Sequence, residues 1–185
     1  MRIVGGEFRG RPLATPKTDA IRPTTDRTRE SLFNILNHAY PEALEGRVMD
    51  LFAGTGAVGI EALSRGCRYA LFVESSVEGR GLLWTNIESL GLTGRARMMR
   101  RDATDLGPVG TLEPFHMAFA DPPYGQGLGE KALHAAASGG WLKPGALVVL
   151  EERADISPTM DVTFRFLEER TFGDTKMHFF RYQPA

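Results

Sequence analysis

Apolar positions divide the chain into short runs separated by glycine, proline and charged residues. Near the start, Leu32, Phe33 and Leu36 recur at helical spacing. Thr25 precedes them and is a typical N-cap residue, so the pattern predicts a helix that begins there. Beyond Pro41 the pattern changes to short apolar runs that are typical of buried strands. The predicted strands are Val48–Phe52, Tyr69–Val73, Ala96–Met99, Phe115–Ala120 and Ala146–Leu150.

Helix-like stretches alternate with these strands. They are Ala57–Ser64, Val77–Leu90 and a segment near Glu130–Ala137. This alternation is typical of a mostly parallel sheet with helices on both sides, so we expect an α/β fold. Gly79 and Gly81 each weaken the second helix by about 1 kcal/mol relative to Ala. No functional reason for these two glycines is evident from the sequence.

The C-terminal part breaks the alternation. Val162–Leu167 and Lys176–Tyr182 are strand-like, and Gly173-Asp174 between them supplies a turn. Such a pair predicts an antiparallel hairpin. We therefore expect a mostly parallel sheet that ends antiparallel.

The composition narrows the class of protein. The 185 residues are 42% hydrophobic and 24% charged, which is average for a soluble globular protein. No apolar run approaches the roughly 18 residues that span a bilayer, and the N-terminus lacks the apolar region of a secretory signal. Cys67 is the only cysteine, which excludes a disulfide framework within the chain and a zinc cluster of cysteines. These features predict a cytoplasmic protein without a membrane segment or metal site.

The net charge of −1 conceals a basic N-terminus. Residues 1–29 carry seven basic and three acidic side chains, a local excess of four positive charges. Such an excess suits contact with a polyanion such as nucleic acid. On charge alone, a solvated arm remains the alternative. We expect one domain, residues 1–185, with a basic extension at 1–24 and a helix plus core at 25–185.

A glycine-rich turn lies between the first predicted core strand and its helix, in the stretch MDLFAGTGAVGIEAL. Gly54, Gly56 and Gly59 satisfy G-x-G-x-x-G, the dinucleotide-binding fingerprint. Glu74 stands twenty residues after Gly54, at the end of the second strand, where a carboxylate can hold ribose hydroxyls. The loop alone fits NAD and S-adenosylmethionine equally well.

Two further acids favour S-adenosylmethionine. Asp50 lies in the strand just before the loop, where its carboxylate can approach a cationic amino-acid group. Asp102 ends the third strand and can accept a hydrogen bond from an adenine amino group. The alternatives are a local salt bridge for Asp50 and a turn cap for Asp102. Because parallel strands bind ligands at their carboxyl ends, we expect Asp50, Glu74 and Asp102 to converge on one crevice.

The motif Asp121-Pro122-Pro123-Tyr124 follows the fourth strand. An exocyclic amino group or amide nitrogen is a poor nucleophile because its lone pair is delocalised. The Asp121 carboxylate and the Pro122 carbonyl are two acceptors for its N–H bonds, and the second proline holds the carbonyl in extended backbone. Tyr124 offers a face for stacking, worth about 1–3 kcal/mol for a base. The alternative interpretation of the motif is a strand terminator and turn.

Together these motifs resemble the S-adenosylmethionine-dependent amino-methyltransferases. More narrowly, the chain is similar to the RsmD family, which methylates N2 of a guanine in bacterial small-subunit ribosomal RNA. The resemblance is nearly full length. It includes MRIVGGEFRGRPLATP, RPTTDRTRESLFNIL, DLFAGTGAVGIEALSRG and the tail RTFGDTKMHFFRY. The DPPY motif alone is less specific, since related motifs occur in enzymes that act on adenine, guanine or glutamine amides.

The resemblance implies a Rossmann-like class I methyltransferase fold, S-adenosylmethionine as cofactor and 16S rRNA as substrate, free or within a small ribosomal subunit particle. It implies no metal, and we expect a monomer. The implied cofactor contacts are Asp50, Phe52, Ala53, Gly54, Thr55, Gly56, Glu74, Asp102 and Ala103. The implied catalytic residues are Asp121, Pro122, Pro123 and Tyr124. The implied RNA contacts are Arg9, Arg11 and Arg22.

Three other functions stay open at this stage. One is an amino-methyltransferase that acts on DNA adenine or on a protein glutamine. A second, from a different class, is an NAD-dependent oxidoreductase that uses the Gly54–Gly59 loop, although the chain has no obvious acid for hydride transfer. The third is a non-catalytic RNA-binding module that has kept the fold.

Overall fold

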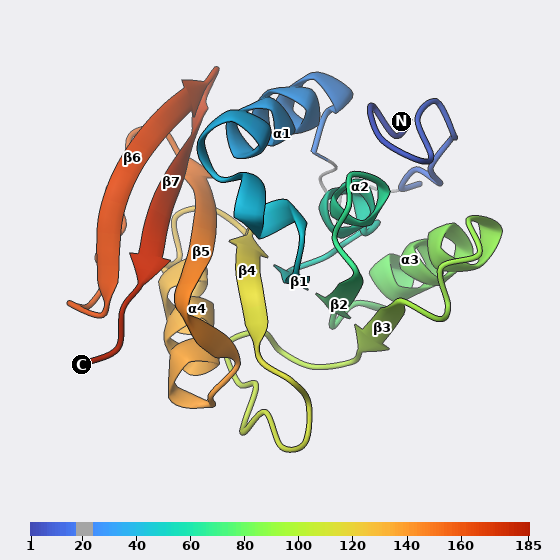
Figure 1. Cartoon of the computed structure of the whole chain (residues 1–185). Coiled ribbons are helices and arrows are strands. Elements are labelled where there is room, and N and C mark those ends of the chain that lie inside the picture. The colour runs from blue at the N-terminus through green and yellow to red at the C-terminus, as the bar shows by residue number, and fades with distance from the viewer. Residues whose placement is uncertain (18–23) are drawn as a thin grey trace.

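A computed structural model describes residues 1–17 and 24–185 (Figure 1). The RNA contact expected at Arg22 lies outside these residues. The helices are α1 Asp26–Ala39, α2 Ala57–Ser64, α3 Val77–Ser89 and α4 Leu128–Ser138, with a 3₁₀ turn, η1, at Pro41–Leu44. The strands are β1 Arg47–Leu51, β2 Tyr69–Val73, β3 Ala96–Met99, β4 Phe115–Ala120, β5 Leu142–Arg153, β6 Phe164–Phe172 and β7 Thr175–Tyr182.

The described strands form one seven-stranded sheet in the order β3-β2-β1-β4-β5-β7-β6. Strands β1 to β5 run parallel, whereas β7 is antiparallel to both β5 and β6. The predicted mostly parallel sheet with an antiparallel end is therefore confirmed. The chain moves from β1 toward one edge and then returns to place β4 on the other side of β1. This reversal opens a crevice at the carboxyl ends of β1 and β4, where ligands bind in such folds.

Helices cover both faces of the sheet (Figure 1). On one face, α1, α2 and α3 share a core with sheet residues such as Phe72, Phe119 and Phe179. On the other face, α4 packs on residues such as Val148 and Leu150. Each core strand is therefore buried on both sides, which is why it reads as a continuous apolar run.

The predicted first helix forms as expected. The side-chain oxygen of Thr25 accepts a hydrogen bond from the Thr28 backbone N–H at 3.1 Å, which satisfies one donor of the first turn. Leu32, Phe33 and Leu36 are buried against the sheet. Burial of this apolar stripe fixes the helix beside β7.

Two strands are longer than their apolar runs predict. The expected strand Ala146–Leu150 is only the middle of β5, which extends to Arg153 because Glu151 and Glu152 pair with Met177 and Lys176 of β7. Likewise, β6 continues to Phe172 along β7. Polar residues extend these strands because the backbone of a neighbouring strand is available, and an apolar pattern cannot show this.

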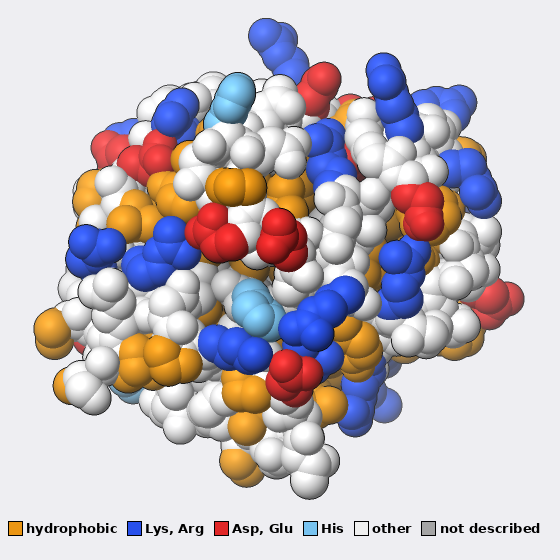
Figure 2. Space-filling view, in the orientation of Figure 1, with side chains coloured by type: hydrophobic (Ala, Val, Ile, Leu, Met, Phe, Trp, Pro, Cys, Tyr) orange, Lys and Arg blue, Asp and Glu red, His pale blue; other side chains and the backbone are white. Residues whose placement is uncertain are grey.

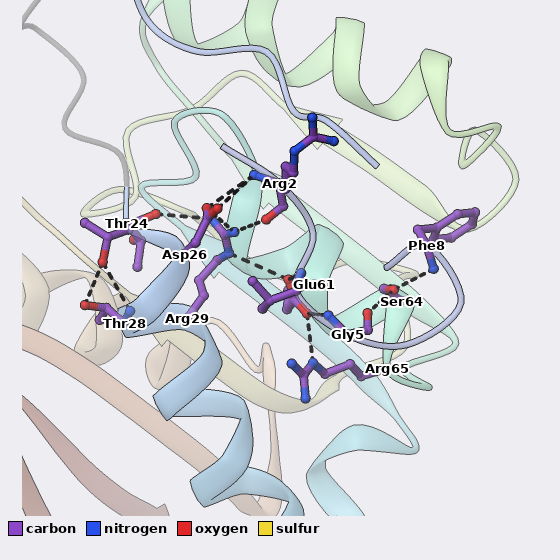
Figure 3. A network of polar contacts seen from close by, with 12 residues as sticks. Arg2, Gly5, Phe8, Thr24, Asp26, Thr28, Arg29, Glu61, Ser64 and Arg65 are labelled. Atoms are coloured by element: carbon purple, nitrogen blue, oxygen red, sulfur yellow. Dashed lines mark hydrogen bonds and ion pairs between the residues drawn. The ribbon is translucent and has the colours of Figure 1, made fainter. Parts of the chain in front are cut away.

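The N-terminal segment, residues 1–17, packs against α1, α2 and α3. The strand expected at Arg2–Val4 is reduced to a single antiparallel bridge between Arg2 and Pro12. Ile3 and Leu13 are buried in the core that α1, α2 and α3 share. Figure 3 shows a polar network that joins the segment to α1 and α2, with Glu61 of α2 at its centre.

Glu61 is fully buried and joins four partners. Its carboxylate accepts hydrogen bonds from the backbone N–H groups of Val4 at 3.0 Å and Gly5 at 2.9 Å. It also pairs with Arg65 at 2.8 Å and lies 3.7 Å from the buried Arg29 (Figure 3). The N-terminal segment is thus fixed to the helix that follows the glycine loop.

Candidate active site

A cavity of about 380 Å³ opens at the carboxyl ends of the central strands, within the size range of small-molecule sites. It unites most of the expected site residues. From the expected cofactor set it is lined by Asp50, Phe52, Ala53, Gly54, Thr55, Glu74, Asp102 and Ala103. From the DPPY motif it is lined by Asp121, Pro122 and Pro123. Gly56 and Tyr124 are not among the lining residues, but the rest of the glycine loop, the acids and the first three residues of the DPPY motif share one site.

The loop after β1 has a backbone that only certain residues adopt easily. Gly54 has φ +57° and Gly56 has φ +83°, both in the left-handed region that glycine enters without penalty. Phe52 also has a positive φ, +59°, which is uncommon for a bulky residue. Such backbone strain concentrates at functional sites. Here it turns the chain sharply at the cavity wall, before α2 begins at Ala57.

Asp50, in β1, holds the first turn of α2. Its Oδ2 accepts a hydrogen bond from the Gly59 backbone N–H at 3.0 Å, and the residue is 2% exposed. A side chain at Gly59 would place Cβ 2.4 Å from the Phe72 ring, so this glycine allows α2 to lie close to the sheet. The third glycine of the fingerprint thus serves helix–strand packing.

Burial raises the pKa of Asp50 well above its usual range, and the nearby carboxylates of Asp121 and Glu74 raise it further. The group therefore contributes stability below its unfolded pKa, and that contribution is lost as the pH rises through the folded pKa. A bound cation would offset the repulsion among the three acidic side chains. The cavity is in this sense electrostatically suited to a positively charged ligand.

Glu74 ties two segments of the cavity wall together. One carboxylate oxygen accepts from the Gly54 N–H at 2.6 Å and the other from the Ser76 N–H at 2.9 Å. Each oxygen has a second lone pair that can accept from a ligand hydroxyl. A Cβ on Gly79 would lie 2.7 Å from the Glu74 carboxyl carbon, so Gly79 leaves the space that this carboxylate occupies.

Asp102 caps a turn, which was the alternative interpretation of this residue. Its Oδ1 accepts from the Thr104 backbone N–H at 2.9 Å and from the Thr104 hydroxyl at 2.7 Å. These two hydrogen bonds hold the pKa of Asp102 below its usual range. The side chain is exposed and lines the cavity, so its other oxygen can still face a ligand.

The DPPY loop is anchored by residues that sequence reasoning did not single out. The Tyr124 hydroxyl donates to Glu151 Oε2 at 2.8 Å, and the Gly125 N–H donates to Glu152 Oε1 at 3.1 Å. Both glutamates are buried near the end of β5. A signal existed in the sequence, because two acids directly follow an apolar strand at the edge where ligands bind.

Other cavity residues were also missed. Thr24 borders the cavity just before the cap of α1, and Arg101 borders it beside Asp102. Thr24 comes from the end of the N-terminal region, far from the glycine loop in sequence. No local pattern marks such a residue, because the chain brings it to the site only when α1 packs on the core.

Among the arginines expected to contact RNA, the two that the structure describes, Arg9 and Arg11, lie outside the cavity. Arg9 and Arg11 are exposed on the N-terminal segment, and Arg11 donates to the Ser89 carbonyl at the end of α3. In Figure 2, basic side chains gather at the upper right, where Figure 1 places this segment, and others lie elsewhere on the same face. The segment is a docked part of the molecule that carries exposed positive charge.

No group of three or more His, Cys, Asp or Glu side chains among the described residues is arranged to hold a metal ion. No helix in the described part of the chain has the length and apolar content to cross a bilayer. Cys67 is buried, and burial raises the pKa of its thiol to about 12.

Comparison with known proteins identifies the family. The family described as "Conserved hypothetical protein 95" matches residues 1–181. "Ribosomal RNA small subunit methyltransferase D" of Escherichia coli is 37% identical over 94% of this chain and 85% of the relative. The protein of the same name from Haemophilus influenzae is 33% identical over 94% and 89%.

Solved structures agree with the sequence comparison. The Escherichia coli protein yhhF matches with a TM-score of 0.84 and 33% identity, over 100% of this chain and 99% of that one. The Thermus protein TTHA0928 matches with a TM-score of 0.74 and 33% identity, over 97% and 98%. The expected class I methyltransferase fold is confirmed. The chain belongs to the Conserved hypothetical protein 95 family, the RsmD family of methyltransferases that its motifs resemble.

Proposed function

We propose that this protein transfers a methyl group from S-adenosylmethionine to the N2 amino group of a guanine in 16S rRNA. One observation carries the proposal: the Asp121-Pro122 acceptor pair lines the same cavity as the glycine loop and its acids. The names of the relatives, ribosomal RNA small subunit methyltransferases, support the RNA substrate.

The residues present fit S-adenosylmethionine. The buried carboxylate of Asp50 lies among other acids whose repulsion a cationic ligand relieves. Gly54 and Gly56 let the backbone approach a ligand closely, and Glu74 has acceptor capacity for ribose hydroxyls. Asp102 and Ala103 border the same cavity and suit the adenine end. When bound, the cofactor supplies an electrophilic methyl carbon on a sulfonium.

The DPPY residues prepare the nucleophile. Asp121 and the Pro122 carbonyl accept the two N–H bonds of the guanine amino group, which shifts its lone pair out of conjugation and toward the methyl donor. The guanine nitrogen would gain a bond to the methyl carbon as the bond from that carbon to the sulfonium breaks and its electron pair stays on sulfur, which leaves as a neutral thioether. The nitrogen afterwards loses one proton, for which Asp121 is the acceptor at hand. The protein therefore acts by positioning and electrostatics.

The decisive test compares methyl transfer with cofactor binding. We expect Asp121→Ala to lower transfer to 16S rRNA at least about 100-fold, the scale of losing a positioned catalytic group. S-adenosylmethionine affinity, measured by equilibrium dialysis, should stay within a few-fold of the wild type. Asp105→Ala is the matched control, because this exposed aspartate lies close in sequence and does not line the cavity. Full activity of Asp121→Ala would refute the catalytic role.

The same assay separates the alternatives. Tritiated methyl transfer is measured with free 16S rRNA, small ribosomal subunit particles, DNA and protein. Transfer to DNA adenine or to protein glutamine would replace guanine as the substrate. Binding of NAD in place of S-adenosylmethionine would favour an oxidoreductase, and cofactor binding without transfer to any RNA would favour a non-catalytic RNA-binding module.

A further inference from the structure

Two adjacent glutamates at the end of β5 hold the loop that follows β4. The Tyr124 hydroxyl donates to Glu151 at 2.8 Å, and the Gly125 N–H donates to Glu152 at 3.1 Å. Glu151 is 6% exposed and Glu152 is 1% exposed. Consecutive loop residues are therefore attached to consecutive strand residues.

The register of the sheet explains why β5 can do this. The last pair between β4 and β5 is Ala120 with Leu150, so Asp121 leaves the sheet where β5 continues. β5 continues because Glu151 and Glu152 pair with Met177 and Lys176 of β7. The C-terminal hairpin thus extends a rigid support beyond the end of β4, beside the loop that carries the acceptor pair.

We infer that Glu151 is a positioning residue that fixes the Tyr124 ring and, through the loop, the Asp121-Pro122 acceptor pair. This inference rests on the proposed function. Neither Glu151 nor Tyr124 is among the described residues that line the cavity, so their contact acts through the loop that carries Asp121 and Pro122. A hydroxyl that donates to a carboxylate forms a strong, charge-assisted hydrogen bond.

The chemistry explains why this bond matters. An amino nitrogen must approach the methyl carbon in a near-attack geometry, and a misplacement of about 1 Å can lower the rate about 100-fold. Beyond the two prolines the loop contains Gly125 and Gly127, and glycine restricts the backbone less than any other residue. Attachment to β5 supplies the missing restraint.

Four variants test the inference: Glu151→Leu, Glu151→Gln, Tyr124→Phe and the double variant Glu151→Leu/Tyr124→Phe. Either Glu151→Leu or Tyr124→Phe removes the bond, so we expect each to lower kcat for rRNA methylation about 10- to 100-fold. The double variant should be no slower than the slower single variant, because both changes remove one interaction. Glu151→Gln keeps an acceptor oxygen and should recover most of kcat.

Hydrogen exchange of the backbone amides of Asp121 and residues 124–127 gives a readout that needs no RNA. We expect faster exchange in Glu151→Leu and Tyr124→Phe and wild-type exchange in Glu151→Gln. Unchanged exchange, or rate effects that multiply in the double variant, would overturn the positioning role. If exchange responds as expected but the wild type methylates no rRNA, the positioning link stands and the proposed function fails.

A second tyrosine–glutamate pair in the molecule is the matched control. The Tyr40 hydroxyl donates to Glu168 at 2.5 Å and joins the end of α1 to β6. Neither residue belongs to the loop that follows β4 or to β5. Tyr40→Phe should therefore destabilise the fold without lowering kcat or changing exchange at Asp121 and residues 124–127. An equal loss of kcat in Tyr40→Phe would assign the Tyr124→Phe effect to general stability and overturn the inference.

Discussion

At the scale of single residues, Gly79 and Gly81 stand two positions apart in one helix and differ completely in surroundings. A Cβ at Gly79 would lie 2.7 Å from both the Glu74 carboxyl carbon and the Ser76 hydroxyl. A Cβ at Gly81 would have no atom within 4 Å. The first glycine is required by the position of Glu74, and the second leaves an exposed gap for which the structure offers no reason.

This difference predicts opposite outcomes for two alanine substitutions. Gly81→Ala should stabilise the protein by up to about 1 kcal/mol through helix propensity. Gly79→Ala should lose that gain and weaken S-adenosylmethionine binding at least several-fold, because it displaces the carboxylate that holds Gly54 and Ser76. Urea unfolding and equilibrium dialysis measure the two effects. Equal cofactor affinity in both variants would show that Glu74 does not need this space.

At the scale of elements, the contact between the N-terminal segment and α2 depends on one buried carboxylate. Glu61 accepts from two backbone N–H groups of the segment and pairs with Arg65 and Arg29. Breaking a satisfied buried polar contact costs about 1–3 kcal/mol. The segment also buries Ile3 and Leu13, so apolar packing accompanies the polar anchor.

We therefore expect Glu61→Gln to destabilise the fold by about 1–3 kcal/mol and to expose residues 1–17 to proteolysis. Glu113→Gln is a suitable control, since Glu113, with three cationic side chains within 4.0 Å against two for Glu61, is half-exposed. Its substitution should destabilise the fold much less than Glu61→Gln, because water screens a surface pair. Urea denaturation and limited trypsin digestion measure these effects. A Glu61→Gln variant as stable and protease-resistant as the wild type would contradict the anchoring role.

At the scale of the whole molecule, the exposed arginines of the N-terminal segment lie on the side of α2 and α3, while β6 forms the opposite edge of the sheet (Figure 1). The basic segment thus shares a side of the molecule with the helices that follow the glycine loop and β2. Arg11 contacts the C-terminal end of α3, whereas Ser76 at its N-terminal end borders the cavity, so a polyanion must extend along this side of the molecule to meet both Arg11 and the cavity.

Salt dependence tests this arrangement. The double variant Arg9→Ala/Arg11→Ala should weaken binding to 16S rRNA and reduce the slope of log K against log salt by about 1.5, the value for two lost phosphate contacts. Arg165→Ala/Arg170→Ala on β6 removes the same charge from exposed sites at the far edge and should leave the slope nearly unchanged. Filter binding at several salt concentrations measures both. Equal slopes for the two double variants would show that the N-terminal arginines are a solvated surface that does not contact RNA.

Much of this molecule follows from local patterns. The strands β2, β3 and β4 coincide with their apolar runs, and α2 coincides with its helix-like stretch, because each is defined by its own burial and flanking turns. The glycine loop and the DPPY motif were recognisable for the same reason: a backbone that needs positive φ, or that needs proline, restricts which residues can be there.

The full lengths of β5 and β6, the anchoring of residues 1–17 on Glu61, and the contact of Tyr124 with Glu151 depended on the tertiary structure. In each of these cases a polar residue finds its partner far away in sequence, as Glu61 does with Val4 and Gly5. The sequence by itself determined the parallel core, the hairpin and the chemical groups of the site, because apolar burial and backbone restriction depend on residues that are close together in the chain. Only the tertiary structure decided which acids support the loops and which face the cavity. An aspartate or glutamate is the same residue in either role, and only its neighbours in space distinguish the two.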